Sequence, residues 1–150
     1  MPLTAKRPKP MVPVLGRPVV DYVKDAMVAS GLSEIIVTTG YQGEQLVEHV
    51  ATWDIPSRVN QEETPMGTAG SVRLLSDELT ETFVVGSGDS VASFDIAELL
   101  KSHRESGAKV TMALWRVDDP TEFGIVGLSK QNQGDVESVK KYLEDVEVNL

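Results

Sequence analysis

The 150-residue chain contains no cysteine and only two histidines, His49 and His103. The lack of thiols excludes disulfides, thiol catalysis and thiolate metal sites, and two imidazoles are too few for a histidine-rich zinc site. No apolar run approaches the roughly 20 residues of a membrane span, and the N-terminus lacks the apolar stretch of a signal peptide. We therefore expect a cytoplasmic protein without a membrane partner.

Other absences narrow the function. The sequence has no G-x-G-x-x-G motif, so a dinucleotide-dependent oxidoreductase is not supported, and it has no Ser-His-Asp arrangement with plausible spacing. The formal net charge is −9, which argues against the basic face that broad nucleic-acid binding requires. With 41% hydrophobic and 25% charged residues, the composition is typical of a single soluble globular domain.

Strand and helix patterns alternate along the chain. Pro18 suits the first turn of a helix whose apolar residues recur up to Met27, and Gly31 is placed to end it. Further helical patterns cover residues 46–53, 71–75 and 96–102, strand patterns cover 34–39, 57–60, 83–86 and 109–117, and a hairpin-like region covers 123–136. This alternation predicts an α/β fold with a largely parallel sheet flanked by helices.

The opening segment, Pro2–Val14, combines several prolines with three cations, Lys6, Arg7 and Lys9. Because each proline fixes its φ near about −65° and restrains the residue before it, we expect an extended, rigid segment. A stiff, basic, non-helical stretch suits the holding of a phosphate at a fixed place. The alternative is a disordered basic N-terminus, since chain ends are usually loose.

A second informative stretch is Glu62–Gly70, which reads E-E-T-P-M-G-T-A-G. A proline followed by a glycine lets the flat face of a ligand approach the backbone, and Thr68 can begin the next helix. The alternative is an ordinary turn between a strand and a helix.

A third stretch, Val84–Asp89, places a carboxylate just after a buried-strand pattern. That position is the carboxyl edge of the predicted sheet, where open α/β proteins bind ligands. A carboxylate with phosphates and water can hold Mg²⁺ there, although Asp89 could also be an ordinary turn residue. For Asp95, six residues later, we expect a helix-cap role.

These three stretches, in this order, resemble the sugar-1-phosphate nucleotidyltransferases. Residues 2–14 resemble the second half of the family motif G-G-x-G-T-R-L-x-P-L-T-x-x-x-P-K-P-M-x-P-V, residues 62–70 resemble E-x-x-P-L-G-T-A-G, and residues 84–89 resemble V-x-x-G-D. The resemblance extends to about residue 144 and implies a Rossmann-like fold. The form of residues 62–70 is closer to guanylyl-transferring, mannose-using relatives than to thymidylyl-transferring ones.

The resemblance implies an enzyme that joins a sugar 1-phosphate to a nucleoside triphosphate and releases pyrophosphate. By the same resemblance, Lys9 would neutralise phosphate charge in catalysis and Asp89 would bind Mg²⁺. The implied base-recognition residues are Glu62, Pro65, Gly67 and Thr68, and the implied sugar-binding residues are Gly124 and Glu144. His103 matches a family histidine that we interpret as structural.

Relative to this family, residues 1–150 correspond to one nucleotidyltransferase domain truncated at both ends. The glycine-rich loop, the first strand that feeds it and a second metal-binding aspartate are not in the sequence. We therefore expect weak or no activity from this form alone. Two alternatives stay open, a non-catalytic regulatory module that binds a nucleotide or sugar nucleotide, and a subunit that completes its sheet with a partner strand as a homo-oligomer.

Overall fold

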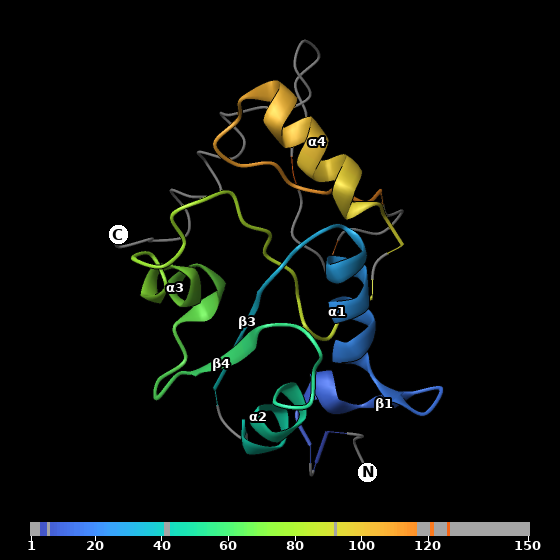
Figure 1. Ribbon diagram of the computed structural model, residues 1–150. Helices are drawn as coiled ribbons and strands as arrows, with labels where there is room; N and C mark the ends of the chain where they lie inside the picture. The colour runs from blue at the N-terminus through green and yellow to red at the C-terminus, as the bar shows by residue number, and fades with distance from the viewer. Residues whose placement is uncertain are drawn as a thin grey trace. The chain divides into compact units, whose positions relative to one another are not determined.

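The computed structural model describes residues 4–5, 7–40, 43–91, 93–116, 121 and 126, and the chain divides into two compact units, Met1–Thr111 and Met112–Leu150. All the regular elements described lie in the first unit (Figure 1). In chain order they are η1 (Lys9–Met11), β1 (Pro13–Val14), β2 (Arg17–Pro18), α1 (Val19–Ala29), β3 (Ile35–Thr39), α2 (Glu44–Val50), β4 (Ser57–Gln61), α3 (Gly67–Leu74) and α4 (Ile96–Ser106).

Strands β3 and β4 form a parallel ladder joined by α2, which is the βαβ arrangement that the alternating pattern predicts. The register pairs Ile35 with Ser57 and ends with Thr39 opposite Gln61. The pairing continues one residue beyond the strands, because the Glu62 N–H donates to the Thr39 carbonyl over 2.8 Å. The loops that follow β3 and β4 therefore start from the same edge of the sheet.

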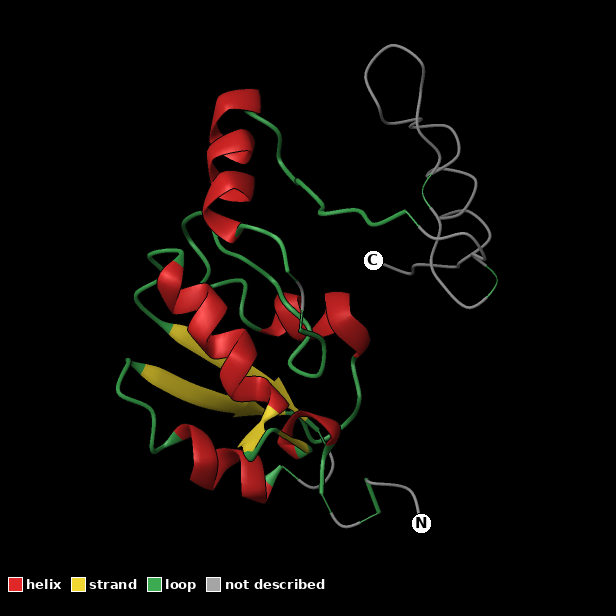
Figure 2. Ribbon diagram, turned by 90° about the vertical axis from the view of Figure 1, so that its right-hand side faces the viewer, coloured by secondary structure: helices red, strands yellow, loops and turns green. Residues whose placement is uncertain are grey.

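Helices α1 and α2 pack against one face of this ladder. Val20 of α1 and Leu46 and Val50 of α2 form a buried cluster, against which Val37 and Val59 pack from the strands. Figure 2 shows α1 crossing one face of the two strands. Side chains alternate between the faces of a strand, so Arg58 lies on the opposite face from Val59. There Arg58 forms an ion pair with Glu78, which follows α3.

One carboxylate ties α1 to α2 at the edge of this core. Asp21 Oδ1 lies 2.7 Å from His49 Nε2 and accepts a hydrogen bond from Trp53 Nε1 over 3.0 Å. The His49 ring also meets the Trp53 ring edge-on, with 6.3 Å between centroids. The sequence pattern did not reveal this contact, because it joins residues about 30 positions apart.

A short antiparallel hairpin, β1–β2, precedes α1 and is absent from the sequence predictions. Its turn places Gly16 at φ +81°, a left-handed conformation that glycine adopts without a steric penalty. The Tyr22 hydroxyl donates to the Val14 carbonyl over 2.8 Å, and the Arg17 guanidinium lies 4.8 Å from the centre of the Tyr22 ring and 2.6 Å from Asp25. These contacts fix the hairpin on α1.

Helix α4 confirms the predicted cap. The Asp95 side chain accepts hydrogen bonds from the Ala97 and Glu98 N–H groups over 2.8 and 3.2 Å. The helix runs to Ser106, about one turn beyond the prediction, and Gly107 ends it at φ +62°. Among the described residues, no helix is long and apolar enough to cross a membrane.

The predicted strands at residues 83–86 and 109–117 are wrong as far as the structure describes them, because residues 82–87 and 110–116 contain no regular element. Both runs have strand-like side chains, but a strand also needs a neighbour with which to exchange hydrogen bonds. Residues 83–86 line a cavity instead. The hairpin-like region 123–136 lies outside the described residues, apart from residue 126.

We expect the Leu46→Ala substitution to lower the free energy of unfolding by about 2–5 kcal/mol, since a cavity would replace a side chain that is 2% exposed. Val47→Ala is the matched control, because Val47 is the next residue on the same helix and is 40% exposed. Its effect should be well under half as large. Urea unfolding followed by circular dichroism measures both, and equal losses would contradict the position assigned to the core.

Candidate functional site

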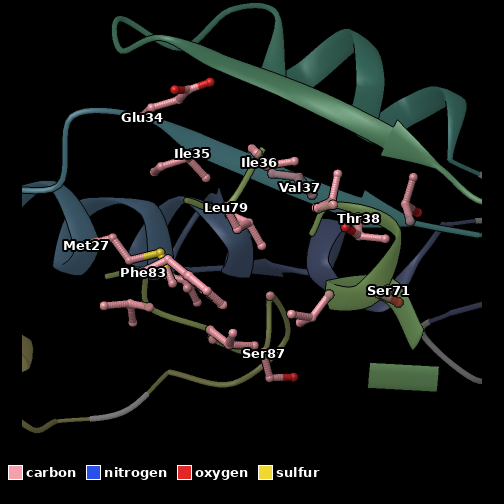
Figure 3. Close-up of a pocket in the computed structure, with 18 of the residues that line it drawn as sticks. Met27, Glu34, Ile35, Ile36, Val37, Thr38, Ser71, Leu79, Phe83 and Ser87 are labelled. Atoms are coloured by element: carbon pink, nitrogen blue, oxygen red, sulfur yellow. The ribbon is translucent and has the colours of Figure 1, made fainter. Parts of the chain in front are cut away.

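A cavity of about 1040 Å³ extends along β3 to the loops beyond its carboxyl end. Its wall includes residues from all three stretches singled out in the sequence, namely Pro10, Glu62, Pro65, Gly67, Thr68, Ser87 and Gly88. In Figure 3, Thr38, Ser71 and Ser87 lie toward one end of the pocket, and Met27, Ile35 and Phe83 toward the other. The first end is the edge at which open α/β sheets bind ligands.

The opening segment forms a turn at Lys9 rather than the extended stretch expected. Residues Lys9–Met11 make one 3-10 turn, in which the Met11 N–H donates to the Pro8 carbonyl over 2.9 Å and the Val12 N–H to the Lys9 carbonyl over 3.0 Å. The φ that proline imposes also suits the first turn of a helix, which is why Pro10 permits this geometry. Met11 packs against the core cluster. Lys9 is therefore an exposed cation on an anchored turn.

The aspartate loop lies directly against that turn. A Cβ placed on Gly88 would be 3.6 Å from Pro10 Cγ and 3.9 Å from Val20 Cγ2, which are ordinary contact distances. Asp89 Oδ1 accepts a hydrogen bond from the Ser87 hydroxyl over 2.6 Å, and a longer one from the Ser90 hydroxyl over 3.4 Å. The sequence interpretation had overlooked Ser87, although a serine two residues before an aspartate is a frequent partner in turns.

The Ser87 hydrogen bond holds the pKa of the Asp89 carboxyl below its ordinary value, and the charge of Lys9 acts in the same direction. The structure thus brings the predicted catalytic cation and the predicted metal ligand into electrostatic reach of each other. Neither residue lines the cavity, but their neighbours Pro10 and Gly88 do. The residues predicted to bind phosphate are therefore next to residues that line the same cavity as the predicted base-binding residues.

The loop from Glu62 to Thr68 is closed by a hydrogen bond from its backbone to the Glu62 side chain. Glu62 Oε2 accepts a hydrogen bond from the Met66 N–H over 3.3 Å, while Glu62 Oε1 is buried and has no hydrogen-bond partner among the described residues. Gly67 begins α3 at φ +69°, in the left-handed region that favours glycine. Pro65, Gly67 and Thr68 are exposed at the cavity wall.

The residues around Asp89 fit Mg²⁺ as a site that the substrate completes. The described residues contain no group of three or more histidine, aspartate or glutamate side chains that could hold a metal ion. Mg²⁺ is usually bound by one or two carboxylates together with substrate phosphates and water, so a single ionised aspartate beside a phosphate site is sufficient. Both hydroxyl hydrogen bonds reach Oδ1, so Oδ2 is the Asp89 oxygen that would bind the metal.

The sequence-predicted sugar-binding residues, Gly124 and Glu144, lie outside the described residues. Their roles stay predictions. His103, which we interpreted as structural, lies on α4 and does not line the cavity. Its Nδ1 atom is 2.8 Å from the Thr111 hydroxyl.

Residues 1–144 match the family described as Nucleotidyl transferase. Mannose-1-phosphate guanylyltransferase of Mycobacterium tuberculosis is 32% identical over 136 residues, which cover 88% of this chain and 38% of that protein. Mannose-1-phosphate guanylyltransferase 1 of Arabidopsis thaliana is 28% identical over 144 residues, covering 91% of this chain and 40% of that protein. The chain thus spans about two fifths of the length of these relatives.

Among solved structures, HddC from Yersinia pseudotuberculosis, complexed with GMP-PN, is similar with a TM-score of 0.59 and 23% sequence identity. The similarity covers 64% of this chain and 44% of that chain. At this identity the likeness concerns the fold, and it confirms the Rossmann-like α/β fold expected from the sequence.

Replacing Ser87 by alanine should raise the pKa of Asp89, because the carboxylate loses its shortest hydrogen bond. A lowered pKa in the folded state stabilises the fold above the unfolded-state pKa, about 3.9, and this contribution disappears as the pH falls. Ser87→Ala should therefore reduce the part of the folding stability that depends on ionised Asp89 and is lost as the pH falls. A carboxyl ¹³C NMR titration measures the shift, with Ser90→Ala as the control of smaller effect, and an unchanged Asp89 pKa in Ser87→Ala would contradict the assigned geometry.

Proposed function

The chain belongs to the nucleotidyl transferase family, and we propose that the protein transfers a nucleotidyl group from a nucleoside triphosphate to a sugar 1-phosphate, with release of pyrophosphate. The observation that carries this proposal is the shared cavity. Its lining includes the Glu62–Thr68 loop, Pro10 of the Lys9 turn, and Ser87 and Gly88 of the Asp89 loop. A nucleotide needs one surface for the base and another for the phosphates.

We infer that the base is guanine, held by the Glu62 carboxylate. Glu62 Oε1 is a buried acceptor with no partner among the described residues, and such an atom is costly unless a ligand donor reaches it. An ionised carboxylate accepts hydrogen bonds only, and guanine presents two adjacent donors, N1–H and N2–H₂. Uracil and thymine present a single N–H between two carbonyl oxygens, which the carboxylate would repel. The names of the guanylyltransferase relatives support the same base and suggest mannose as the sugar.

At the phosphate end, the proposed roles follow from charge and position. The sugar phosphate oxygen attacks the α-phosphorus in line, so a bond forms from that oxygen to phosphorus and the bond from phosphorus to the pyrophosphate oxygen breaks. Lys9 neutralises charge on the reacting phosphates from its anchored turn, and Asp89 is the side chain that would hold Mg²⁺. When bound, Mg²⁺ supplies further charge neutralisation on the triphosphate. Catalysis by these residues is then mainly positioning and electrostatic stabilisation.

Lys9→Ala should lower the rate of pyrophosphate release by about 10²–10³-fold, the usual cost of removing one group that stabilises developing charge. The assay uses GTP, mannose 1-phosphate and Mg²⁺, and a panel of other nucleotides and hexose phosphates identifies the true pair. Lys101→Ala is the control, because Lys101 is an exposed cation on α4. Turnover that is unaffected by loss of Lys9 would contradict its role.

Glu62→Gln should weaken GTP binding by about 10- to 100-fold, because a hydrogen bond to a charged acceptor contributes about 1.5–3 kcal/mol. Binding of UTP, which is expected to be weak, should not fall. Glu63→Gln is the matched control, since it removes the same charge from the adjacent, exposed residue. Isothermal titration calorimetry measures the binding of GTP and of UTP to the unaltered chain and to both variants. Equal effects of the two substitutions, or a preference for UTP in the unaltered chain, would contradict guanine recognition by Glu62.

A further inference from the structure

Gly70 occupies a position at which glycine is unfavourable. It lies in the interior of α3, and a glycine inside a helix loses more conformational freedom on folding than an alanine would. Gly70 does not line the cavity, and its φ is not in the left-handed region. Neither a ligand contact nor the backbone conformation therefore accounts for a glycine here.

The space beside Gly70 is occupied by the side chain of Met66. A Cβ placed on Gly70 would be 2.6 Å from Met66 Cβ, and 3.8 Å from both Met66 Cγ and Met66 Cε. Carbon atoms that are not bonded to each other pack at about 3.5–4.0 Å, so the two longer distances are ordinary contacts and the shortest one is a clash. A methyl group at position 70 would therefore displace Met66.

This close contact follows from the way in which the chain enters α3. In a regular helix, Cβ atoms four residues apart are separated by about 5–6 Å. Met66 instead precedes the helix, with φ −96° and ψ −6°, and Gly67 follows it with φ +69°. The left-handed Gly67 turns the chain so that Met66 lies against the first turn of the helix. The Ser71 hydroxyl donates to the Gly67 carbonyl over 2.9 Å, which holds this entry in place.

Met66 in turn holds the carboxylate to which we assign base recognition. Its N–H donates to Glu62 Oε2 over 3.3 Å, which is the one hydrogen bond of the Glu62 side chain among the described residues, and Oε1 is buried. The Glu62 backbone is fixed separately, by its own N–H bond to the Thr39 carbonyl over 2.8 Å. The direction of the carboxylate therefore depends on where Met66 lies, whereas the position of the Glu62 backbone does not.

We propose that Gly70 is a positioning residue for guanine selection, because the absence of a Cβ gives Met66 its place and the Met66 N–H then aims the Glu62 carboxylate. This inference rests on the proposed recognition of guanine by Glu62. Two parallel hydrogen bonds to N1–H and N2–H₂ require a fixed carboxylate orientation, since each bond weakens steeply as its angle closes. Displacement of Met66 should therefore weaken the binding of GTP more than that of ITP, which has the N1–H group but lacks the amino group.

Calorimetric titration of the whole chain with GTP and with ITP tests the proposal. The unaltered chain should bind GTP about tenfold more tightly than ITP, and Gly70→Ala should reduce this ratio toward one by lowering the affinity for GTP. Gly70→Ala should stay folded by circular dichroism, because alanine favours a helix. Ala69→Ser is the matched control, since it adds one heavy atom at the exposed neighbouring position of the same helix and should preserve the ratio.

A second substitution identifies the atom responsible. The clash is with Met66 Cβ, so adding Met66→Gly to Gly70→Ala should restore the GTP-to-ITP ratio to that of Met66→Gly alone. Adding Met66→Ala, which keeps the Cβ, should not restore it. A ratio that Gly70→Ala leaves unchanged in a chain that prefers GTP, or equal restoration by Met66→Ala and Met66→Gly, would overturn the proposal.

The Met66 amide signal in NMR spectra separates a failure of this inference from a failure of the proposed function. Without nucleotide, Glu62→Ala should move the Met66 amide proton signal upfield, and Gly70→Ala should move it in the same direction, because both changes remove the hydrogen bond to Glu62. If the unaltered chain does not distinguish GTP from ITP, guanine recognition by Glu62 is wrong, and the Met66 signal still tests the positioning role. A Met66 signal that Gly70→Ala leaves unmoved overturns that role.

Discussion

Five residues of β3 pair in parallel with five of β4, and the Glu62 N–H extends the pairing to the Thr39 carbonyl over 2.8 Å. This last bond fixes where the Glu62–Thr68 loop leaves the sheet. Because α2 joins the two strands and buries Leu46 and Val50 against α1, the same ladder also fixes the helix against which the opening turn packs. The Glu62–Thr68 loop and the Lys9 turn are thus positioned by one structural unit, although they are more than 50 residues apart in the chain.

Charged side chains are few among the three stretches that meet at the cavity. Of the four carboxylates that line it, Glu34, Glu62, Glu78 and Glu81, only Glu62 belongs to these stretches. The cation Lys9 and the carboxylate Asp89 adjoin the lining residues Pro10 and Gly88. In a chain with net charge −9, the anchored Lys9 turn supplies a local cation beside the cavity lining. The Ser87 hydrogen bond and the charge of Lys9 both lower the pKa of the Asp89 carboxyl, which favours the ionised form that a divalent cation would require.

Sequence patterns predicted the elements that depend mainly on neighbouring residues in the chain. Pro18 and Gly31 bracket α1 as expected, the β-branched run at residues 35–39 forms β3, and Asp95 caps α4. These features depend on backbone preferences and neighbouring side chains, which a sequence displays directly. The three motifs also meet at one cavity, as expected of loops at the carboxyl edge of a sheet.

Features that depend on distant partners were not predictable in this way. Residues 83–86 have the side chains of a buried strand, but no neighbour pairs with them in the described part of the chain. The contact of Asp21 with His49 and Trp53, and the approach of Gly88 to Pro10, likewise join segments that no local pattern connects. The turn at Lys9 differed from the extended segment expected because proline at position 10 is compatible with both geometries.

We propose that the Lys9 turn, the Asp89 loop and the Glu62–Thr68 loop bind different parts of a single nucleotide. The most direct test is an NMR titration of the ¹⁵N-labelled chain with GTP, first with Mg²⁺ and then with paramagnetic Mn²⁺. We expect Mn²⁺ to broaden the amide signals of Lys9, Gly88 and Asp89, while those of Glu62 and Gly67 shift with GTP and broaden less. Broadening centred on another part of the chain, or shifts confined to residues outside the cavity wall, would contradict it.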